Sequence, residues 1–157
     1  MTNNLDLEAA VRDLVDRQSI SELIYAYCEC FDRNDPEGVA ELFTPDAVID
    51  YNPDTANIVG AELADTIAVG LRDLFSATSH HVSNVMITME GPDTARSLCY
   101  IDAWHRYHSG APDGFLWGRY KNRFIRTDAG WRISHLLLQG AGTSDFHRER
   151  MHGIGRA

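Results

Sequence analysis

Cysteine is scarce in this chain, and its few cysteines do not follow the spacing of a disulfide framework or a metal site. There are three, Cys28, Cys30 and Cys99. The number is odd, and the CxxC spacing of zinc-binding and redox motifs does not occur. We therefore expect all three thiols to be small buried hydrophobic groups in a reducing compartment.

Long hydrophobic runs and a basic leader are also missing. No window of the sequence approaches the ~18 uninterrupted apolar residues that a membrane-spanning helix needs. The chain begins MTNNLDLEAA, with acidic residues where a signal peptide carries lysine or arginine and no apolar run after them. We therefore expect a cytoplasmic protein without a membrane partner.

Positive charge is in short supply. Lysine and arginine total 14 against 23 acidic residues, which gives a formal net charge of -9. Such a surface repels a polyanion unless a local basic stripe compensates. The richest basic stretch, Arg119 to Arg126, alternates with apolar residues and so indicates one face of a strand. We therefore expect no nucleic-acid partner.

The common cofactor and nucleophile motifs are absent as well. The sequence contains no Gly-rich phosphate loop, no GxSxG elbow and no HExxH zinc motif. No serine or cysteine lies in a recognisable nucleophile context, and no repeat or low-complexity tract occurs. What remains is general acid–base chemistry, for which we expect neither a cofactor nor a metal.

The first third of the chain has helical periodicity. Its 157 residues are 44% hydrophobic, which predicts one domain over residues 1–157. An apolar stripe opens with Leu7 and continues to Phe31, and the helix should end around Asp32 to Asn34. Asp35-Pro36 is an N-cap followed by proline, which starts a short helix through Phe43. A short strand over Ala47 to Tyr51 and a helix over Ala61 to Ser76 should follow; the stripe of the first helix includes Leu7, Val11, Leu14, Val15, Ile20, Leu23, Ile24 and Tyr27.

From Thr78 onward the period changes to two, which predicts strands. Short, well-marked turns between long strands imply antiparallel neighbours. Helices followed by such strands give an α+β fold, in which a curved antiparallel sheet wraps around the N-terminal helices and encloses a mostly apolar pocket. The residues from Thr143 onward should lie on the surface or cover the pocket mouth. The predicted strands are His80 to Met89, Ala95 to Tyr107, Phe115 to Arg126 and Trp131 to Leu138.

Asp32 and the pair His80-His81 are the first candidates for chemistry. Asp32 flanks the buried face at the end of the first helix, where the helix dipole disfavours a carboxylate. Most such aspartates are solvent-exposed turn residues, but an unfavourable position invites a functional explanation. Adjacent strand residues face opposite sides, so only one of the two histidines can point inward, and alternation does not decide which.

The predicted inner faces of the strands supply further polar groups. On the Ala95 to Tyr107 strand the more apolar face carries His105, and on the next strand the inner face carries Tyr120. Tyr51 ends the short first strand, where its ring can pack while its hydroxyl reaches a polar group. Histidine titrates near neutral pH, and a neighbouring aspartate fixes its tautomer. Tyrosine hydroxyls can donate to a developing oxyanion, so this set suits proton abstraction beside a carbonyl.

Four segments give the chain a family resemblance. They are the helix end Tyr27-Cys-Glu-Cys-Phe-Asp32, then DPEGVAELFTPDAVIDY, TSHHVSN and DAGWRIS, and the likeness is strongest at FDRND, AVIDY, SHHVSN and GWRIS. In this order they resemble the SnoaL-like families of the nuclear transport factor 2-like superfamily. Scytalone dehydratase, bile-acid 7α-dehydratase, lindane dehydrochlorinase and polyketide cyclases belong to them. The resemblance covers nearly the whole chain and implies a cystatin-like, cone-shaped half-barrel.

The resemblance also implies roles for individual residues. Asp32 and His80 match the aspartate–histidine pair of these enzymes. Tyr51 resembles the tyrosine that binds a carbonyl through water in scytalone dehydratase, and His105 lies near the second histidine of that enzyme. Tyr27 matches a helix tyrosine of the bile-acid enzyme. Two positions differ: Tyr120 stands where scytalone dehydratase has asparagine, and Leu136 stands where lindane dehydrochlorinase has arginine, which argues against chloride elimination.

Three functions fit these residues. The first is a lyase that dehydrates a small cyclic or polycyclic hydroxy-carbonyl compound without a cofactor, with His80 as base. The second is a ketosteroid-type isomerase with Asp32 as base, or a polyketide cyclase, and the third is a domain that binds a small molecule without catalysis. In each case the expected partner is a small apolar compound that carries a carbonyl group. A homo-oligomer, dimer or trimer, is also expected because Tyr100, Trp104 and Trp117 should lie on the outer sheet face.

Overall fold

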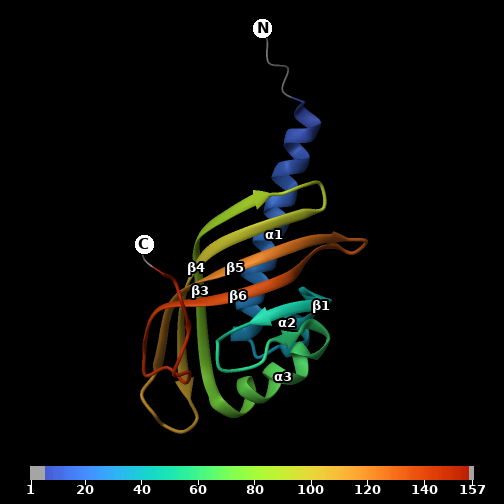
Figure 1. Cartoon of the computed structure of the whole chain (residues 1–157). Coiled ribbons are helices and arrows are strands. Elements are labelled where there is room, and N and C mark those ends of the chain that lie inside the picture. Colours follow the sequence, from blue (N-terminus) through green and yellow to red (C-terminus); the bar gives the residue numbers. More distant parts are fainter. Residues whose placement is uncertain (1–5, 156–157) are drawn as a thin grey trace.

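The computed structural model describes residues 6–155, in which helices precede a large curved sheet (Figure 1). The helices are α1 (Leu7–Asp32), α2 (Pro36–Glu41) and α3 (Leu63–Val69). A 3₁₀ turn at Gly60–Glu62 precedes α3, and a π-helical turn at Gly70–Leu74 follows it. The strands are β1 (Phe43–Asp50), β2 (Ile58–Val59), β3 (Phe75–Met89), β4 (Thr94–Tyr107), β5 (Gly114–Thr127), β6 (Gly130–Ser144) and β7 (His152–Gly153).

The sheet has the order β2-β1-β6-β5-β4-β3, with β7 also paired to β6. The pairs β3–β4, β4–β5 and β5–β6 are antiparallel, as their short connections predict. Two pairings differ from the expected purely antiparallel sheet, because β1 and β7 both run parallel to β6. The α+β class is thus confirmed, with a mixed sheet that does not close into a barrel.

Several element boundaries differ from those predicted. The helix expected to reach Ser76 ends at Leu74, because Phe75 already pairs with Tyr107 at the start of β3. This strand therefore begins five residues before the predicted start at His80. At the other end of the sheet β6 continues past Leu138 to Ser144, where main-chain pairing with β5 persists through a glycine-containing stretch without hydrophobic alternation.

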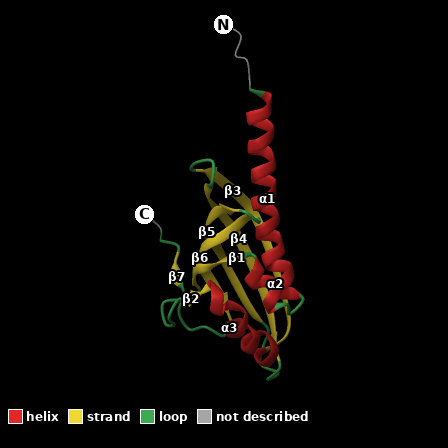
Figure 2. Cartoon of the chain, turned by 90° about the vertical axis from the view of Figure 1, so that its right-hand side faces the viewer, coloured by secondary structure: helices red, strands yellow, loops and turns green. Residues whose placement is uncertain are grey.

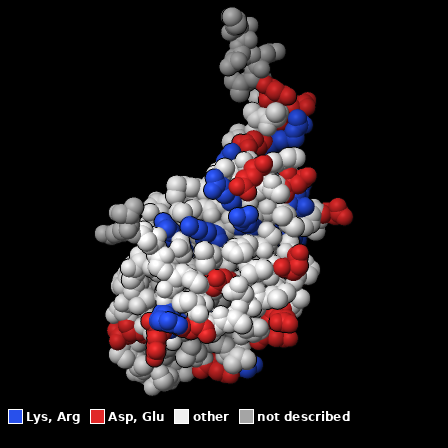
Figure 3. All heavy atoms as spheres, viewed as in Figure 1, with Lys and Arg blue, Asp and Glu red and all other residues white. Residues whose placement is uncertain are grey.

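Strands β4 and β5 alternate between a buried inner face and a more exposed outer face. On β4 the buried residues run from Ala95 to Tyr107, and on β5 they include Tyr120 and Phe124. Lys121 and Arg123, on the outer face of β5, are exposed, so the basic stretch is one face of a strand as predicted. On the face shown in Figure 3, basic side chains lie across the upper part of the body and acidic side chains gather toward its lower end.

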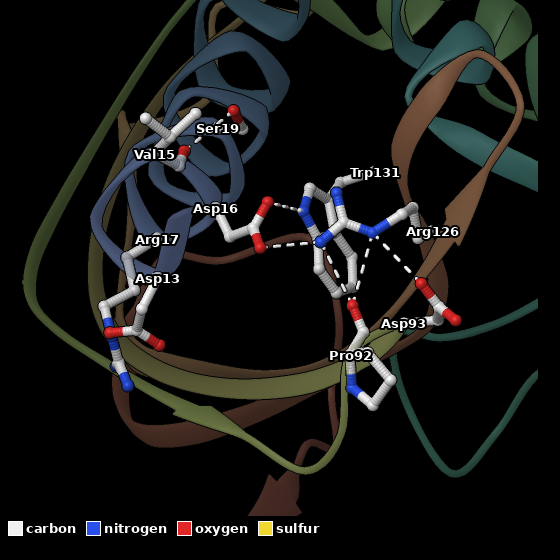
Figure 4. A network of polar contacts seen from close by, with 9 residues as sticks. All are labelled: Asp13, Val15, Asp16, Arg17, Ser19, Pro92, Asp93, Arg126 and Trp131. Atoms are coloured by element: carbon white, nitrogen blue, oxygen red, sulfur yellow. Dashed lines mark hydrogen bonds and ion pairs between the residues drawn. The ribbon is translucent and has the colours of Figure 1, made fainter. Parts of the chain in front are cut away.

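Helix α1 packs along the inner face of the sheet and is anchored there by Asp16 (Figures 2 and 4). The Asp16 carboxylate accepts hydrogen bonds from Trp131 Nε1 at 3.0 Å and from the Arg126 guanidinium at 2.6 Å. The guanidinium of Arg126 also stacks over the Trp131 ring, 4.5 Å from its centroid. The hydrogen bond from Arg126 lowers the pKa of Asp16 against the opposing effect of burial.

Before this anchor, α1 extends beyond the sheet. Figure 1 shows its N-terminal turns projecting away from the rest of the molecule. The first residues of the apolar stripe, Leu7, Val11, Leu14 and Val15, are therefore all exposed. Burial begins only at Ile20, because the sheet lies beside the C-terminal part of the helix and nothing in residues 6–155 covers the first turns.

Helix α2 begins as the Asp35-Pro36 pair predicts. The Asp35 carboxylate accepts a hydrogen bond from the Gly38 amide at 2.9 Å, and Pro36 occupies the first helical position. The helix ends at Glu41, before the predicted end at Phe43, because Phe43 starts β1. Together α2 and α3 lie at the end of the sheet opposite the projecting turns of α1 (Figure 2).

The cysteines are buried, as predicted, and unpaired. Burial raises the pKa of Cys28 and of Cys99 to about 12. Among residues 6–155, no helix combines the length and the apolar character that crossing a bilayer requires.

Candidate active site

The end of α1 brings Asp32 beside β3. Oδ1 of Asp32 lies 2.7 Å from Nδ1 of His80, and Oδ2 accepts a hydrogen bond from the His80 backbone amide at 2.9 Å. The Thr78 hydroxyl donates to the same carboxylate at 2.8 Å. These donors satisfy a carboxylate that the helix dipole disfavours, so the structure brings together the two residues predicted to act as a pair.

These contacts determine the charge and the tautomer of the pair. Burial raises the pKa of Asp32, but the hydrogen bonds from His80 and Thr78 outweigh it, so the pKa of the carboxyl is lowered. An ionised carboxylate only accepts hydrogen bonds, so Nδ1 of His80 carries a proton. The other ring nitrogen, Nε2, is then available as a base in the neutral imidazole.

Of the two adjacent histidines, only His80 faces the cavity. Its side chain is 8% exposed and lies against the ring of Phe31, with the centroids 5.6 Å apart. His81 lies on the opposite, exposed face of β3, where its ring is 3.0 Å from the Ser79 hydroxyl. The strand geometry thus separates two neighbours that alternation alone could not distinguish.

Three buried tyrosines form a second polar group in the cavity. The hydroxyls of Tyr27 and Tyr51 lie 2.8 Å apart, and the Tyr120 ring packs edge-on against Tyr27 with the centroids 5.5 Å apart. Burial raises the pKa of Tyr51 to about 12 and also raises the pKa values of Tyr27 and Tyr120 well above that of an ordinary phenol. All three phenols therefore keep their protons at neutral pH and can donate hydrogen bonds.

The imidazole of His105 lies next to that of His80 in the cavity. Its ring meets that of His80 edge-on, with the centroids 5.3 Å apart, and also packs against Phe75. Burial lowers the pKa of His105 to about 4, so the ring is neutral at pH 7. Its Nδ1 atom is buried and has no hydrogen-bond partner among residues 6–155. All six predicted site residues thus line or adjoin one cavity.

The segment after β6 supplies the site residues that sequence reasoning missed. Phe146, His147 and Arg148 lie over the cavity, with His147 packed between Phe75 and His105. Burial lowers the pKa of His147 to about 3. The prediction that the residues after Thr143 cover the pocket mouth is borne out for this segment, but a polar stretch without periodicity gave no sign of which side chains turn inward.

We call residues 145–155 the strap. Its first residue is bound through its carbonyl by the Tyr107 hydroxyl at 3.1 Å. Farther along, Gln139 donates to the Gly153 carbonyl at 2.9 Å, and His152 Nε2 lies 2.7 Å from an Asp50 carboxylate oxygen. Arg150 pairs with Asp54 on the surface. These contacts fix the strap at both of its ends.

The cavity has a volume of about 320 Å³, which suits a ligand of one to a few rings. Its walls are mainly apolar, and its polar groups converge from α1, the loop after β1, β3, β4, β5 and the strap. Within residues 6–155, no three His, Cys, Asp or Glu side chains gather as metal ligands. The side chains around the cavity include Tyr27, Phe31, Tyr51, Asn52, Ile67, Leu71, Leu74, Phe75, Thr78, His80, His105, Leu116, Tyr120, Leu138, Phe146, His147 and Arg148.

Comparison with protein families decides the relationship. The family model described as a SnoaL-like domain matches residues 12–136, which include the Asp32–His80 pair and five of the strands. The chain belongs to the SnoaL-like family. No curated protein sequence matches it. The resemblance noted in the sequence is thereby confirmed.

Solved structures place this SnoaL-like chain among nuclear transport factor 2-like proteins. A Novosphingobium aromaticivorans protein, provisionally titled a scytalone dehydratase, is 30% identical with a TM-score of 0.88, and the match covers 94% of this chain and 99% of that one. A nuclear transport factor 2-like protein with a cystatin-like fold from the same species is 26% identical with a TM-score of 0.70, covering 90% and 92%. A hexachlorocyclohexane dehydrochlorinase, LinA type 2, shares the fold at 18% identity and a TM-score of 0.79, covering 94% and 99%.

Proposed function

We propose that this SnoaL-like protein is a lyase that dehydrates a small cyclic or polycyclic hydroxy-carbonyl compound by general acid–base catalysis without a cofactor. The observation that carries the proposal is the Asp32–His80 contact of 2.7 Å at an apolar cavity. Membership in the SnoaL-like family supports an elimination reaction, as does the likeness to a protein provisionally described as a scytalone dehydratase and to a dehydrochlorinase of the same fold.

In the proposed reaction His80 acts first as base and then as acid. Nε2 of His80 removes the proton from the carbon beside the carbonyl, and the electrons of the C–H bond move toward the carbonyl oxygen. The ionised Asp32 stabilises the imidazolium that forms. When the enolate collapses, a C=C bond forms, the C–OH bond breaks, and the proton on His80 leaves with the hydroxyl as water.

The tyrosines are proposed to stabilise the enolate. Tyr51 and Tyr27 share one hydrogen bond at 2.8 Å, so one hydroxyl proton of the two remains to donate to the substrate oxygen. Tyr120, beside them, offers a third donor from β5. Buried donors fixed by packing need little reorganisation during reaction, which is the main source of oxyanion stabilisation in enzymes.

The contacts of Asp32 favour His80 over Asp32 as the base. The carboxylate already accepts hydrogen bonds from Thr78, the His80 backbone and the His80 ring. A base of the ketosteroid-isomerase kind would need a free oxygen directed at the substrate, and the lowered pKa of Asp32 also weakens it as a base. The isomerase alternative is therefore the weaker of the two.

The test combines a substrate search with two adjacent histidine variants. Purified protein is screened by thermal shift against phenolic, steroidal and polyketide-like hydroxy-ketones, and each stabilising compound is followed by mass spectrometry for loss of water. With a turned-over compound, His80→Ala is expected to lower kcat by at least ~10²-fold, the usual share of a general base. His81→Ala is the matched control because His81 lies on the outer face, and it should keep wild-type turnover.

Normal turnover by the folded His80→Ala protein would overturn the mechanism. Stabilisation without any change in mass would favour an isomerase or a binding domain instead. The tautomer can be measured without a substrate, because imidazole ¹⁵N chemical shifts distinguish a protonated Nδ1 from a protonated Nε2. The wild type should carry its proton on Nδ1 of His80, held by Asp32, and Asp32→Ala should abolish this preference.

A further inference from the structure

Arg148 is an unusual residue in the wall of the cavity. It is the one lysine or arginine among the cavity-lining residues of the described chain, and it is only half-buried. Its guanidinium lies over the ring of Tyr51, 5.0 Å from the centroid. No hydrogen bond or ion pair joins it to any other residue between 6 and 155. Within residues 6–155, the cation therefore lines the cavity without a counter-charge.

Three carboxylates that contact the cavity wall or the strap already have other partners. Asp32 is bound by His80 and Thr78, Asp50 pairs with His152, and Asp54 pairs with Arg150 on the same strap. The chain has 23 acidic residues, yet none of those between residues 6 and 155 forms an ion pair with Arg148. A partly desolvated guanidinium without a partner is unfavourable unless something supplies its hydrogen bonds. This arrangement is what a site for an anionic ligand requires.

We propose that the ligand of this cavity carries a carboxylate that Arg148 binds. The inference rests on the proposed function only in taking this cavity as the substrate site. The planar fork of a guanidinium matches a carboxylate with two parallel hydrogen bonds, which gives orientation as well as affinity. Arg148 thereby determines specificity, holding a ring system with its reactive carbon toward the Asp32–His80 pair.

A carboxylate fits better than a phosphate. Arg148 is a single cation, and it balances the single charge of a carboxylate. A phosphate ester carries up to two charges and commonly binds a helix N-terminus or a Gly-rich loop in addition to a cation. The other cavity walls near Arg148 are the Tyr51 ring, Phe146 and the neutral His147, which supply no second positive charge.

The experiment compares probes that differ in one group. Dissociation constants are measured by calorimetry for 2-naphthoate, 2-naphthamide and 2-naphthyl phosphate with the wild-type chain. The wild type should bind naphthoate at least ~10-fold more tightly than naphthamide, a typical gain for a hydrogen bond between charged groups. Arg148→Gln should bring that ratio close to one, and Arg148→Lys should keep part of it.

Arg123→Gln is the matched control. It removes the same charge from an exposed position on the outer sheet face, where Arg123 makes no contact with the cavity. This variant should keep the wild-type preference for naphthoate. If net charge alone governed anion binding, naphthoate would bind equally weakly to Arg148→Gln and to Arg123→Gln. That result would overturn the inference.

Other results would also overturn it. These are an unchanged naphthoate-to-naphthamide ratio in Arg148→Gln, no naphthoate binding at millimolar concentration, or tighter binding of the phosphate than of the carboxylate. The inference and the proposed function fail separately. Naphthoate binding by His80→Ala, with no turnover of any hydroxy-carbonyl compound by the wild type, would support the carboxylate site and contradict the lyase. Turnover of neutral hydroxy-carbonyl compounds, together with equal binding of naphthoate and naphthamide, would support the lyase and contradict the carboxylate site.

Discussion

Burial keeps two histidines of the cavity neutral, and this makes the stability of the protein depend on pH. His105 has a pKa lowered to about 4 and His147 a pKa lowered to about 3, both mainly by burial. In the unfolded chain a histidine titrates near 6.5. Between these values the unfolded chain binds more protons than the folded one, so acid favours unfolding.

We therefore expect the free energy of unfolding to fall as the pH is lowered from about 6.5 toward 4. For the 95%-buried His105 the loss amounts to about 3 kcal/mol when complete. Urea unfolding between pH 7 and 5 measures the slope in a range where few carboxylates titrate. His105→Phe should reduce the slope, whereas the exposed His81→Phe should leave it unchanged. An equal slope in wild type and His105→Phe would contradict the prediction.

Single residues also mark the limit of prediction from sequence. Asp32 could be identified because its place at a helix end is electrostatically unfavourable. His80 and His81 could not be distinguished by alternation, because the pattern gives opposite faces without saying which face is inner; the family resemblance favoured His80. Arg148 could not be predicted, since its orientation depends on a strap without periodicity.

At the scale of elements, the strap is held by contacts of unequal strength. The Arg150–Asp54 pair is exposed, with 70% and 36% of the two side chains accessible, and such pairs contribute less than about 1 kcal/mol. Gln139 is buried and joins two partners, since it accepts from Arg119 at 3.0 Å and donates to the Gly153 carbonyl at 2.9 Å. Buried hydrogen bonds that lose one partner are costly.

We therefore expect Gln139→Ala to loosen the strap far more than Asp54→Asn. Hydrogen–deuterium exchange of peptides from residues 145–155 measures this directly. Gln139→Ala should speed exchange there by about tenfold or more, because the Gly153 carbonyl and the Arg119 guanidinium lose their shared partner. Asp54→Asn should change exchange by less than about fivefold. A larger effect of Asp54→Asn would mean that the surface pair holds the strap.

Local sequence signals predicted the bounds of helices and strands better than they predicted which strands pair. Helix α1 and helix α2 begin and end close to the predicted residues because caps and apolar spacing are local. The parallel pairing of β1 with β6 was not predicted, because it joins segments that are far apart in the chain. The third helix was extended too far because Phe75 continues its apolar side while belonging to β3.

At the scale of the whole molecule, the outer sheet face carries an aromatic patch. Tyr100, Phe115 and Trp117 are 44%, 39% and 46% exposed, and the rings of Phe115 and Trp117 stack with centroids 5.9 Å apart. Trp104, predicted to belong to this patch, is partly covered because its Nε1 donates to Asp113 at 2.9 Å. Contiguous exposed aromatic groups on a sheet are typical of an interface.

We expect a dimer or trimer that buries this patch. Light scattering after size exclusion should give a multiple of the 17.6 kDa chain mass. The double variant Tyr100→Glu/Trp117→Glu should raise the dissociation constant by at least ~10-fold, because it places charge in an apolar contact. Val69→Glu, at an exposed position on α3, is the control and should not change the mass. A monomeric wild type at micromolar concentration would contradict the expectation.

The fold class was predictable because helices precede long strands along the chain. This order can be recognised from the spacing of apolar residues, which changes from a helical period to alternation. The pairing of β3 with β4 also contains a register shift between Ser83 and Met86, and such an irregularity bends the strand that carries it. No local pattern predicts that shift.

Alkylation of the buried cysteines can report how often the fold opens. With pKa values near 12, the thiols of Cys28 and Cys99 carry almost no thiolate at neutral pH in the closed fold, and their burial excludes alkylating reagents. Cys28 lies on α1 four residues before Asp32, and Cys99 lies on β4 opposite Tyr120, so both are core residues next to parts of the site. Each alkylated molecule would therefore mark an event in which helix and sheet separated at the site, and the labelling rate would count those events.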